Sequence, residues 1–256
     1  MKQVRQQEII DLINEEGFVS TEALAAHFDV SSQTIRRDLD ALERQGILIK
    51  MYGGATLVGR ETDESSFSFF NYIPSTDHQE EKEAIARKAI SYVNDGATIA
   101  VDIGSTTRML GRELNKKNNL VIITKDVLLA TALFEHPTNK VYLVGGFLGE
   151  RGTTSGEFLK EFLESVSKVD VFFLSTDGVT VNEGFTNDLA AVEVYRSTFL
   201  SQSNLCIALA DSTKFGKTSF YRSCGITEVD SIITDSKLNP TILEEMRQAG
   251  ASIELA

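Results

Sequence analysis

Residues 19–39 read VSTEALAAHFDVSSQTIRRDL, and this stretch predicts two short helices joined by a tight turn. The first helix spans residues 21 to about 27, directly after a serine that can cap it. The second follows the serines at positions 31 and 32, either of which can cap it, and stops at Gly46. An apolar-faced helix around residues 9–13 precedes both, so the order of elements is that of a helix-turn-helix module.

The helix that begins near Ser32 has two distinct faces. Ile35, Leu39 and Leu42 follow one another at the spacing of a single helical face, which must therefore point to the core. The opposite face is polar, and its N-terminal half carries no acidic residue. In helix-turn-helix docking this end enters the major groove, where Gln bonds adenine edges and Arg bonds guanine edges or phosphates. The candidate DNA-binding residues are Ser31, Ser32, Gln33, Thr34, Arg36, Arg37, Lys50 and Tyr52.

Two short apolar runs follow, at residues 47–50 and 55–58, and they flank a Gly-Gly pair. Such runs predict a β-hairpin, and a hairpin after the third helix is the wing of a winged helix-turn-helix module. Lys50 and Tyr52 on this wing are placed to reach the DNA backbone beside the groove. We expect a DNA-binding domain at residues 1–58, a polar linker at 59–78 and an α/β domain at 79–256.

The charge balance restricts how the chain can hold nucleic acid. Its 256 residues include 25 Lys and Arg against 37 Asp and Glu, a net charge of −12. Residues 1–58 hold six positive and nine negative side chains, a net charge of −3. Because phosphates are repelled on average, DNA must be held by a local cationic patch rather than by bulk charge. The alternative is a protein-binding adaptor module in which Arg36 and Arg37 are solvated surface charges.

The composition argues against several other classes of protein. The three histidines lie far apart, and the two cysteines lack C-x-x-C spacing, so neither a metal site nor a disulfide framework is expected. The N-terminus lacks the apolar segment of a signal peptide, and no apolar run reaches the length of a membrane helix. We therefore expect a cytoplasmic protein that uses no membrane, metal or other cofactor.

From about residue 79 the chain alternates short, β-branched-rich apolar runs with helices of about ten residues. Strands that are apolar throughout and separated by helices predict a mostly parallel α/β sheet, buried on both faces. The predicted strands are residues 98–103, 120–124, 141–144, 171–175, 205–210 and 231–234.

The sequence VDIGSTT at residues 101–107 follows one predicted strand and opens a helix. Gly104 permits close backbone approach, and the three residues after it offer hydroxyls beside the free N–H groups of a helix start. This combination predicts an anion cradle suited to a monophosphate. The chain lacks both G-x-x-x-x-G-K-[ST] and G-x-G-x-x-G, so a nucleotide is not indicated. The plainer alternative is an ordinary capped helix start after a glycine turn.

Polar side chains also follow the other predicted strands, at the sheet edge where open α/β sheets bind ligands. Lys125, Arg196 and Lys214 supply candidate positive charges for an anionic ligand. The carboxylates of this group can accept hydrogen bonds from sugar hydroxyls. The candidate effector site comprises Asp102, Gly104, Ser105, Thr106, Thr107, Thr124, Lys125, Asp177, Gly178, Thr186, Glu193 and Lys214.

Several of these motifs together resemble one protein family. TIRRDL at residues 34–39 and YGGA at 52–55 resemble the DNA-binding domain of the DeoR family of bacterial transcriptional regulators. The second half resembles the same family in the loop at 102–107, in LVGG at 143–146 and in ADSTKFG at 210–216. The resemblance covers nearly the whole chain. It implies a C-terminal domain related to ribose-5-phosphate isomerase and similar sugar-phosphate enzymes.

The resemblance also implies a function. It indicates a repressor, a homo-oligomeric dimer or tetramer, that binds double-stranded operator DNA and is released by a phosphorylated sugar or a related metabolite. The phosphate would lie at the Ser-Thr-Thr loop and Lys214. The chain departs from the family pattern at Lys125-Asp126, where Asn-Ser is usual, and at Ser175-Thr176, where Gly-Ala is usual. Arg196 also replaces a usual Lys.

A sugar-phosphate isomerase with a fused helical module is the enzymatic alternative. Proton abstraction beside a carbonyl needs a positioned carboxylate and a stabiliser for the enediolate, and Asp102, Asp177, Glu193 and Lys214 are suitable types. The related isomerases, however, have a denser acidic cluster after the Asp-Gly pair and a Lys followed by a glycine run. Here Val-Thr follows Asp177-Gly178, and Lys-Gly-Gly-Gly is absent, so we expect a regulator rather than an enzyme.

Overall fold

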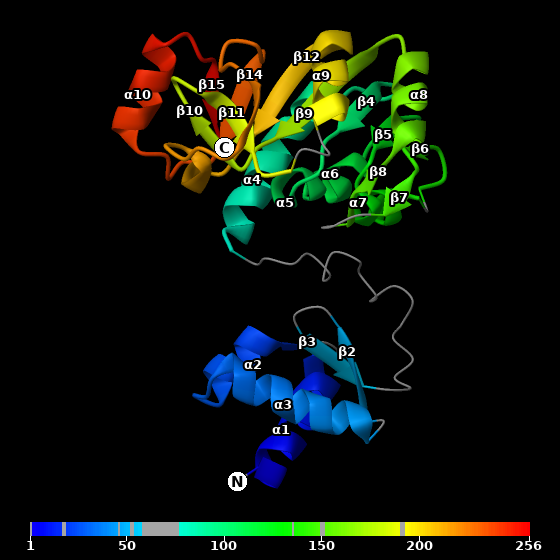
Figure 1. Cartoon of the computed structure of the whole chain (residues 1–256), viewed down its shortest axis with the longest axis vertical. Helices are drawn as coiled ribbons and strands as arrows, with labels where there is room; N and C mark the ends of the chain where they lie inside the picture. Colours follow the sequence, from blue (N-terminus) through cyan, green and yellow to red (C-terminus); the bar gives the residue numbers. More distant parts are fainter. Residues whose placement is uncertain are drawn as a thin grey trace. The chain divides into compact units, whose positions relative to one another are not determined.

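The computed structural model describes residues 2–16, 19–45, 47–51, 54–57, 77–134, 136–148, 152–189 and 193–256. It divides the chain into two compact units, Met1–Pro74 and Ser75–Ala256 (Figure 1). Tyr52 and residues 59–76 of the expected linker lie outside the described residues. No helix in the described ranges is both long enough and apolar enough to cross a membrane.

The N-terminal unit consists of three helices and a small antiparallel sheet. Strand β3 pairs with β1 on one side and with β2 on the other. The predicted helix-turn-helix and its wing hairpin are confirmed, whereas β1 is a short strand that the sequence pattern did not predict. The elements are α1 (Lys2–Glu16), β1 (Val19–Ser20), α2 (Thr21–His27), α3 (Ser32–Arg44), β2 (Leu48–Met51) and β3 (Gly54–Leu57).

The apolar face predicted for α3 forms the core of this unit. Ile35, Leu39 and Leu42 expose 0%, 1% and 2% of their surface. They belong to one apolar cluster with Ile9 and Ile13 of α1. Burying this face fixes the opposite face of α3 toward solvent, because helical side chains on opposite faces cannot both be covered by the same core.

The C-terminal unit alternates strands and helices, and all six predicted strands are present. Its first part comprises α4 (Gln79–Ala89), η2 (Ile90–Tyr92), β4 (Thr98–Val101), α5 (Ser105–Arg108), α6 (Leu110–Leu114), β5 (Val121–Thr124), α7 (Val127–Leu133), β6 (Lys140–Leu143), β7 (Phe147–Leu148) and β8 (Thr154–Ser155). Its second part comprises α8 (Glu157–Ser165), β9 (Val169–Ser175), β10 (Gly178–Thr180), β11 (Gly184–Asn187), α9 (Glu193–Gln202), β12 (Ser203–Leu209), η5 (Ser212–Lys214), β13 (Tyr221–Cys224), β14 (Ser231–Thr234), α10 (Pro240–Gln248) and β15 (Ile253–Leu255).

Seven parallel strands form the main sheet, in the order β15-β14-β12-β9-β4-β5-β6. From β4 the chain adds β5 and β6 on one side, and it then crosses back to build β9 and its successors on the other. The strand order therefore reverses between β4 and β9. In open α/β sheets, ligands bind outside the carboxyl ends of the strands at such a switch point.

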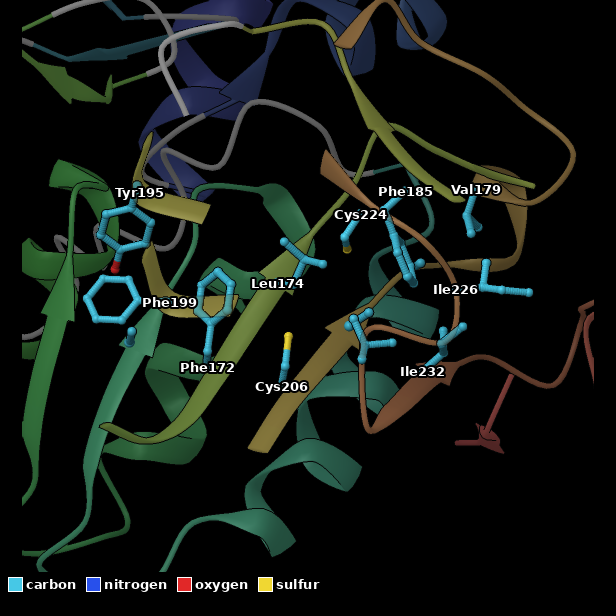
Figure 2. Close-up of a cluster of buried hydrophobic side chains, with 14 of the residues drawn as sticks. Phe172, Leu174, Val179, Phe185, Tyr195, Phe199, Cys206, Cys224, Ile226 and Ile232 are labelled. Carbon is cyan, nitrogen blue, oxygen red and sulfur yellow. The ribbon is translucent and has the colours of Figure 1, made fainter. Parts of the chain in front are cut away.

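An aromatic cluster holds α9 against this sheet. Phe172 of β9 lies beside Tyr195 and Phe199 of α9, with ring centroids 4.8 to 6.1 Å apart (Figure 2). The buried Tyr195 hydroxyl lies 2.8 Å from the carbonyl oxygen of Ile123 at the end of β5. These contacts fix the start of α9, and with it Arg196, at the carboxyl edge of the sheet.

Smaller strands complete the unit, and the sequence pattern did not predict them. β10, β11 and β13 form a three-stranded antiparallel sheet beside the end of β9, and β7 and β8 form a short hairpin after β6. β15 adds the last parallel strand. Each has two to four residues, which is too short for an alternating pattern to stand out from the surrounding turns.

Candidate functional site

Helix α3 presents two cations to solvent. Arg36 and Arg37 are both exposed, and neither makes an ion pair or hydrogen bond with any residue that the structure describes. Gln33, one turn earlier, is exposed as well. The DNA-binding hypothesis requires this arrangement, because guanidinium groups tied to internal carboxylates could not reach a base edge or a phosphate.

Asp38, the acid that follows these arginines, points the other way. Its side chain exposes 1% of its surface and accepts hydrogen bonds from Arg5 Nε at 2.7 Å and Gln6 Nε2 at 3.1 Å, both on α1. The Arg5–Asp38 ion pair thus neutralises this carboxylate inside the unit. The solvent-facing start of α3 is consequently a small cationic surface on an acidic chain.

The first turn of α3 is fixed by its cap. Ser31 Oγ accepts a hydrogen bond from the Thr34 backbone amide at 3.3 Å and lies 2.9 Å from Thr34 Oγ1. Ser31 is exposed, while Ser32 and Thr34 are half-buried. Lys50 belongs to β2, but its side chain, like the whole of Tyr52, lies outside the described residues.

The predicted anion loop lies at the switch point, directly after β4. A β-carbon on Gly104 would come within 2.1 Å of Ser175 Oγ at the end of β9, so only glycine fits there. The Thr107 hydroxyl is buried and donates to the Gly104 carbonyl at 3.0 Å. The hydroxyls of Ser105 and Thr106, in contrast, have no hydrogen-bond partner in the described part of the chain. Ser105 is half-buried and Thr106 exposes only 4% of its surface, so the Ser105 hydroxyl is the more accessible of the two.

Asp102 and Thr124 were candidate effector contacts, and both side chains are fully buried. Asp102 Oδ2 accepts from Arg196 Nε at 2.6 Å and from the Ser175 amide at 3.1 Å, so it joins β4, β9 and α9. Thr124 Oγ1 donates to the Val101 carbonyl at 2.9 Å and accepts from the Asp126 amide at 3.1 Å. Both side chains hold the sheet edge together beneath the loop.

The charged residues that depart from the family pattern, Lys125, Asp126 and Arg196, are all buried. Lys125 exposes none of its surface, and burial lowers its pKa to about 8, although Asp102 favours its charged form and Arg196 opposes it. Beside it, Arg108 Nε donates to Asp126 Oδ2 at 2.7 Å. Lys125 and Arg196, expected as ligand-facing cations, are thus enclosed by protein.

The Asp177-Gly178 turn supports the small antiparallel sheet. A β-carbon on Gly178 would meet the Lys217 carbonyl oxygen at 2.5 Å, which explains the glycine. Thr186 Oγ1 donates to the Gly178 carbonyl at 3.1 Å and accepts from the Ser219 amide at 2.9 Å. Asp177 accepts a hydrogen bond from the Asp188 amide at 3.2 Å. Glu193 is the first residue of α9, and its side chain lies outside the described part of the chain.

Two lysines come together at the end of β12. Lys214 in η5 is half-buried and has no ion pair among the described residues. Lys82 of α4 exposes 5% of its surface and donates to the Asp77 carbonyl at 2.6 Å. Burial lowers the pKa of Lys82; the carboxylate of Asp211 opposes this shift, and Lys214 adds to it. Helix α4 also packs against α5, which carries Ser105 and Thr106.

Lys82 is not among the candidates that the sequence predicted. It sits on a helix that precedes the first strand of the sheet, so the rule that ligands gather at strand ends cannot find it. Together these elements supply two ammonium groups, a close-approach glycine, and two hydroxyls that have no hydrogen-bond partner among the described residues. These groups suit a phosphate-sized anion.

Models of two known domain families match this chain. A DeoR-like helix-turn-helix domain matches residues 5–61, and a DeoR C terminal sensor domain matches residues 77–236. The chain belongs to the DeoR family of transcriptional regulators. A DeoR-family chain with this N-terminal unit is a DNA-binding transcriptional regulator, as the sequence predicted.

Curated relatives agree along the full length. The HTH-type transcriptional regulator GolR of Listeria innocua is 32% identical over 98% of both chains. The glycerol-3-phosphate regulon repressor of Escherichia coli K12 is 31% identical over the whole of both chains. Among solved structures, ribose 5-phosphate isomerase from Plasmodium falciparum is 20% identical, with a TM-score of 0.38, over 54% of this chain and 52% of that chain.

Proposed function

We propose that this DeoR-family regulator is a repressor whose α3 binds operator DNA and whose sensor unit binds a phosphorylated sugar that releases it. The exposed pair Arg36 and Arg37, with no internal ionic partner in the described residues, carries the DNA part of the proposal. The name of the glycerol-3-phosphate regulon repressor, a relative along the whole chain, supports regulation of genes for a small phosphorylated substrate. In this proposal residues 1–58 bind DNA, residues 79–256 bind the effector, and residues 59–78 connect the two domains. The protein acts in the cytoplasm.

On DNA, the first turns of α3 enter the major groove. There the side chains of Gln33, Arg36 and Arg37 form hydrogen bonds with base edges or phosphates, because amide and guanidinium groups donate to those acceptors. The hydroxyls of Ser31, Ser32 and Thr34 contact the flanking phosphates, and Lys50 and Tyr52 extend the contact from the wing. One small module buries too little surface for tight specific binding, so two copies act on paired half-sites.

In the sensor unit, the effector's phosphate is held by Ser105, Thr106, Lys82 and Lys214. The two ammonium groups supply charge, while the hydroxyls and the Gly104 backbone allow close approach. The effector's hydroxyl groups face Asp177 and Glu193 at the neighbouring strand end. Asp102, Thr124, Lys125 and Thr107 support this site from beneath, since their side chains are buried in contacts with protein.

The same geometry favours binding over catalysis. An isomerase at this site needs a carboxylate free to take a proton beside the substrate carbonyl. Of the candidate bases, Asp102 is fully buried and engaged by Arg196, so its carboxylate holds the fold rather than taking a proton from a ligand. The effector acts instead by binding more tightly to a conformation with low affinity for DNA than to one with high affinity. Only such a difference in effector affinity can shift the populations of the two conformations.

The test is operator retention with and without candidate effectors. We expect a duplex from upstream of the regulated genes to be retarded at moderate salt, and one phosphorylated sugar to release it where its unphosphorylated form does not. Lys214→Met should weaken the response to that sugar phosphate by about 1.5–3 kcal/mol, the range for a charged hydrogen bond. Inorganic phosphate serves as the control for charge alone. Release by all sugars alike, or retention of no upstream duplex, would contradict the proposal.

A further inference from the structure

The two edge strands of the seven-stranded sheet, β15 and β6, differ in the side chains that surround them. At one edge, Glu254 of β15 pairs with Lys88 at 3.2 Å and also accepts a hydrogen bond from Tyr92. Arg247 donates to the Ile253 carbonyl at 3.2 Å, which satisfies part of the strand's outer main chain. Charged side chains of this kind prevent an edge strand from pairing with another chain.

The other edge, formed by β6, has one exposed charged side chain in the described residues, that of Lys140, and its other exposed side chains are apolar. Tyr142 and Leu143 on β6 expose 47% and 41% of their surface, and Phe147 and Leu148 on β7 expose 76% and 60%. Figure 1 shows β6 at the border of the sheet with β7 and β8 beside it. We call these four residues the β6–β7 edge. Clustered exposed apolar side chains on an open strand mark an interaction surface.

Charge favours a second copy of this chain as the occupant. The whole chain carries −12, so two copies repel each other over most of their surfaces. Residues 140–148 contain one lysine and no carboxylate, which makes this edge a place where two acidic copies can approach. The choice of a second copy also rests on the proposed function, because paired half-sites require two DNA-binding units in one assembly.

The hydrogen-bond pattern of β6 sets the register. The amides of Lys140 and Val144 point inward, donating to Leu120 and Thr124 carbonyls at 2.8 Å. Directions alternate along a strand, so the main-chain groups of Val141 and Leu143 point outward. An antiparallel copy pairs both residues within the two β6 strands when Val141 of each chain lies opposite Leu143 of the other. Tyr142 then lies on the two-fold axis, opposite its own copy.

We propose that the β6–β7 edge joins two copies of this chain, with the β6 strands paired antiparallel about Tyr142 into one continuous sheet. The interface is isologous, as a two-fold dimer requires. Phe147 and Leu148 of each copy are buried against the partner's edge. This pairing brings the two sensor units together independently of DNA.

Full-length protein and its molar mass in solution provide the first test. Phe147→Asp with Leu148→Asp should raise the dimer dissociation constant by roughly 30-fold or more, the effect of losing an interface hot spot. The matched control is Phe220→Asp, since Phe220 is 83% exposed but lies on another loop. A monomeric wild type, or a dimer that the double variant leaves intact, would overturn the inference.

A cysteine placed on the axis provides the second test. Residues opposite each other at a non-hydrogen-bonded position have Cα atoms about 4.5 Å apart, within disulfide range. Tyr142→Cys should therefore yield a covalent dimer under mild oxidation, whereas Val141→Cys should not, because it faces Leu143. Cys206 and Cys224 are buried, and the wild type controls for them. Equal cross-linking of both variants, or of neither, would refute this register and with it the proposed pairing.

Operator binding separates this inference from the proposed function. If the Asp variants stay dimeric and bind the operator normally, the β6–β7 edge is not the interface, and the repressor proposal stands. If no variant or wild-type protein retards any upstream duplex, the repressor proposal fails whatever the molar mass shows.

Discussion

Helix α3 and the buried part of the sensor unit use arginine in opposite ways. Arg36 and Arg37 of α3 are exposed and have no ionic partner among the described residues. Arg108 and Arg196 of the sensor unit expose only 6% and 3% of their surface, and each donates to a buried carboxylate. The guanidinium groups of α3 therefore face solvent, whereas those of Arg108 and Arg196 are held by internal carboxylates.

Burial decides which role an arginine takes. An exposed guanidinium retains its water and can exchange that water for a phosphate or a base edge at little cost. A buried guanidinium has already lost its water, so its fixed carboxylate is needed to offset the desolvation. The arginines of α3 should thus control DNA affinity without affecting stability, while those of the sensor unit should do the reverse.

The largest expected effect is on the buried pair. Asp102→Ala leaves Arg196 charged and enclosed, and we expect it to lower the free energy of unfolding by about 3–5 kcal/mol, measured by chemical denaturation. The control is Glu113→Ala, which breaks a surface pair with the exposed Lys116 and should cost at most about 1 kcal/mol. Equal losses in the two variants would show that burial does not distinguish these pairs.

The arginines of α3 come next. Arg36→Ala and Arg37→Ala should each weaken operator binding by about 1–3 kcal/mol if they read base edges. Unfolding free energies should change by no more than about 0.5 kcal/mol, as at other surface positions. Arg87→Ala, an exposed arginine on α4, controls for the loss of surface charge. Unchanged operator binding in both α3 variants would favour the adaptor alternative.

The fold was predictable where local pattern and burial agree. The i, i+4, i+7 spacing of Ile35, Leu39 and Leu42 predicted the buried face of α3, and continuous apolar runs predicted the six central strands of the sheet. The antiparallel pairing of β11 with β13 could not be predicted, because it joins Phe185 to Cys224 across a long stretch of chain. Such strands form where tertiary contacts allow them rather than where propensity demands them.

The candidate site was predictable in location more than in detail. The rule that ligands bind at strand ends predicted that the Ser105–Thr106 loop and Lys214 lie at one edge of the sheet. In the structure the loop follows β4, at the β4–β9 switch point, and Lys214 follows β12. The rule could not show that Lys125 and Arg196 are buried, since Arg196 reaches Asp102 across 94 positions of sequence. Lys82 was missed because α4 precedes the sheet.

A pH profile tests the burial of Lys125. Its folded pKa of about 8 lies below the usual 10.5, so between these values the unfolded chain holds more protons than the folded one. The free energy of unfolding contributed by this group therefore rises with pH in that window, by at most about 1.4 kcal/mol per pH unit. Lys125→Met should make the measured rise shallower. Lys82 is present in the wild type and in the variant, so its contribution is the same in both. If the free energy of unfolding rises equally with pH in the two proteins, Lys125 is not an enclosed ammonium group.

The smallest expected effect tests whether Ser31 only caps α3 or also contacts DNA. Ser20 and Ser31 cap α2 and α3 by accepting backbone hydrogen bonds at 3.0 and 3.3 Å. Replacing either by Ala should lower the free energy of unfolding by about 1 kcal/mol, the usual cost of losing a cap. Only Ser31 lies at the proposed DNA surface, so Ser31→Ala alone should also weaken operator binding. If both variants lose stability equally and bind the operator like the wild type, Ser31 is a cap only, and the cationic surface of α3 begins at Gln33.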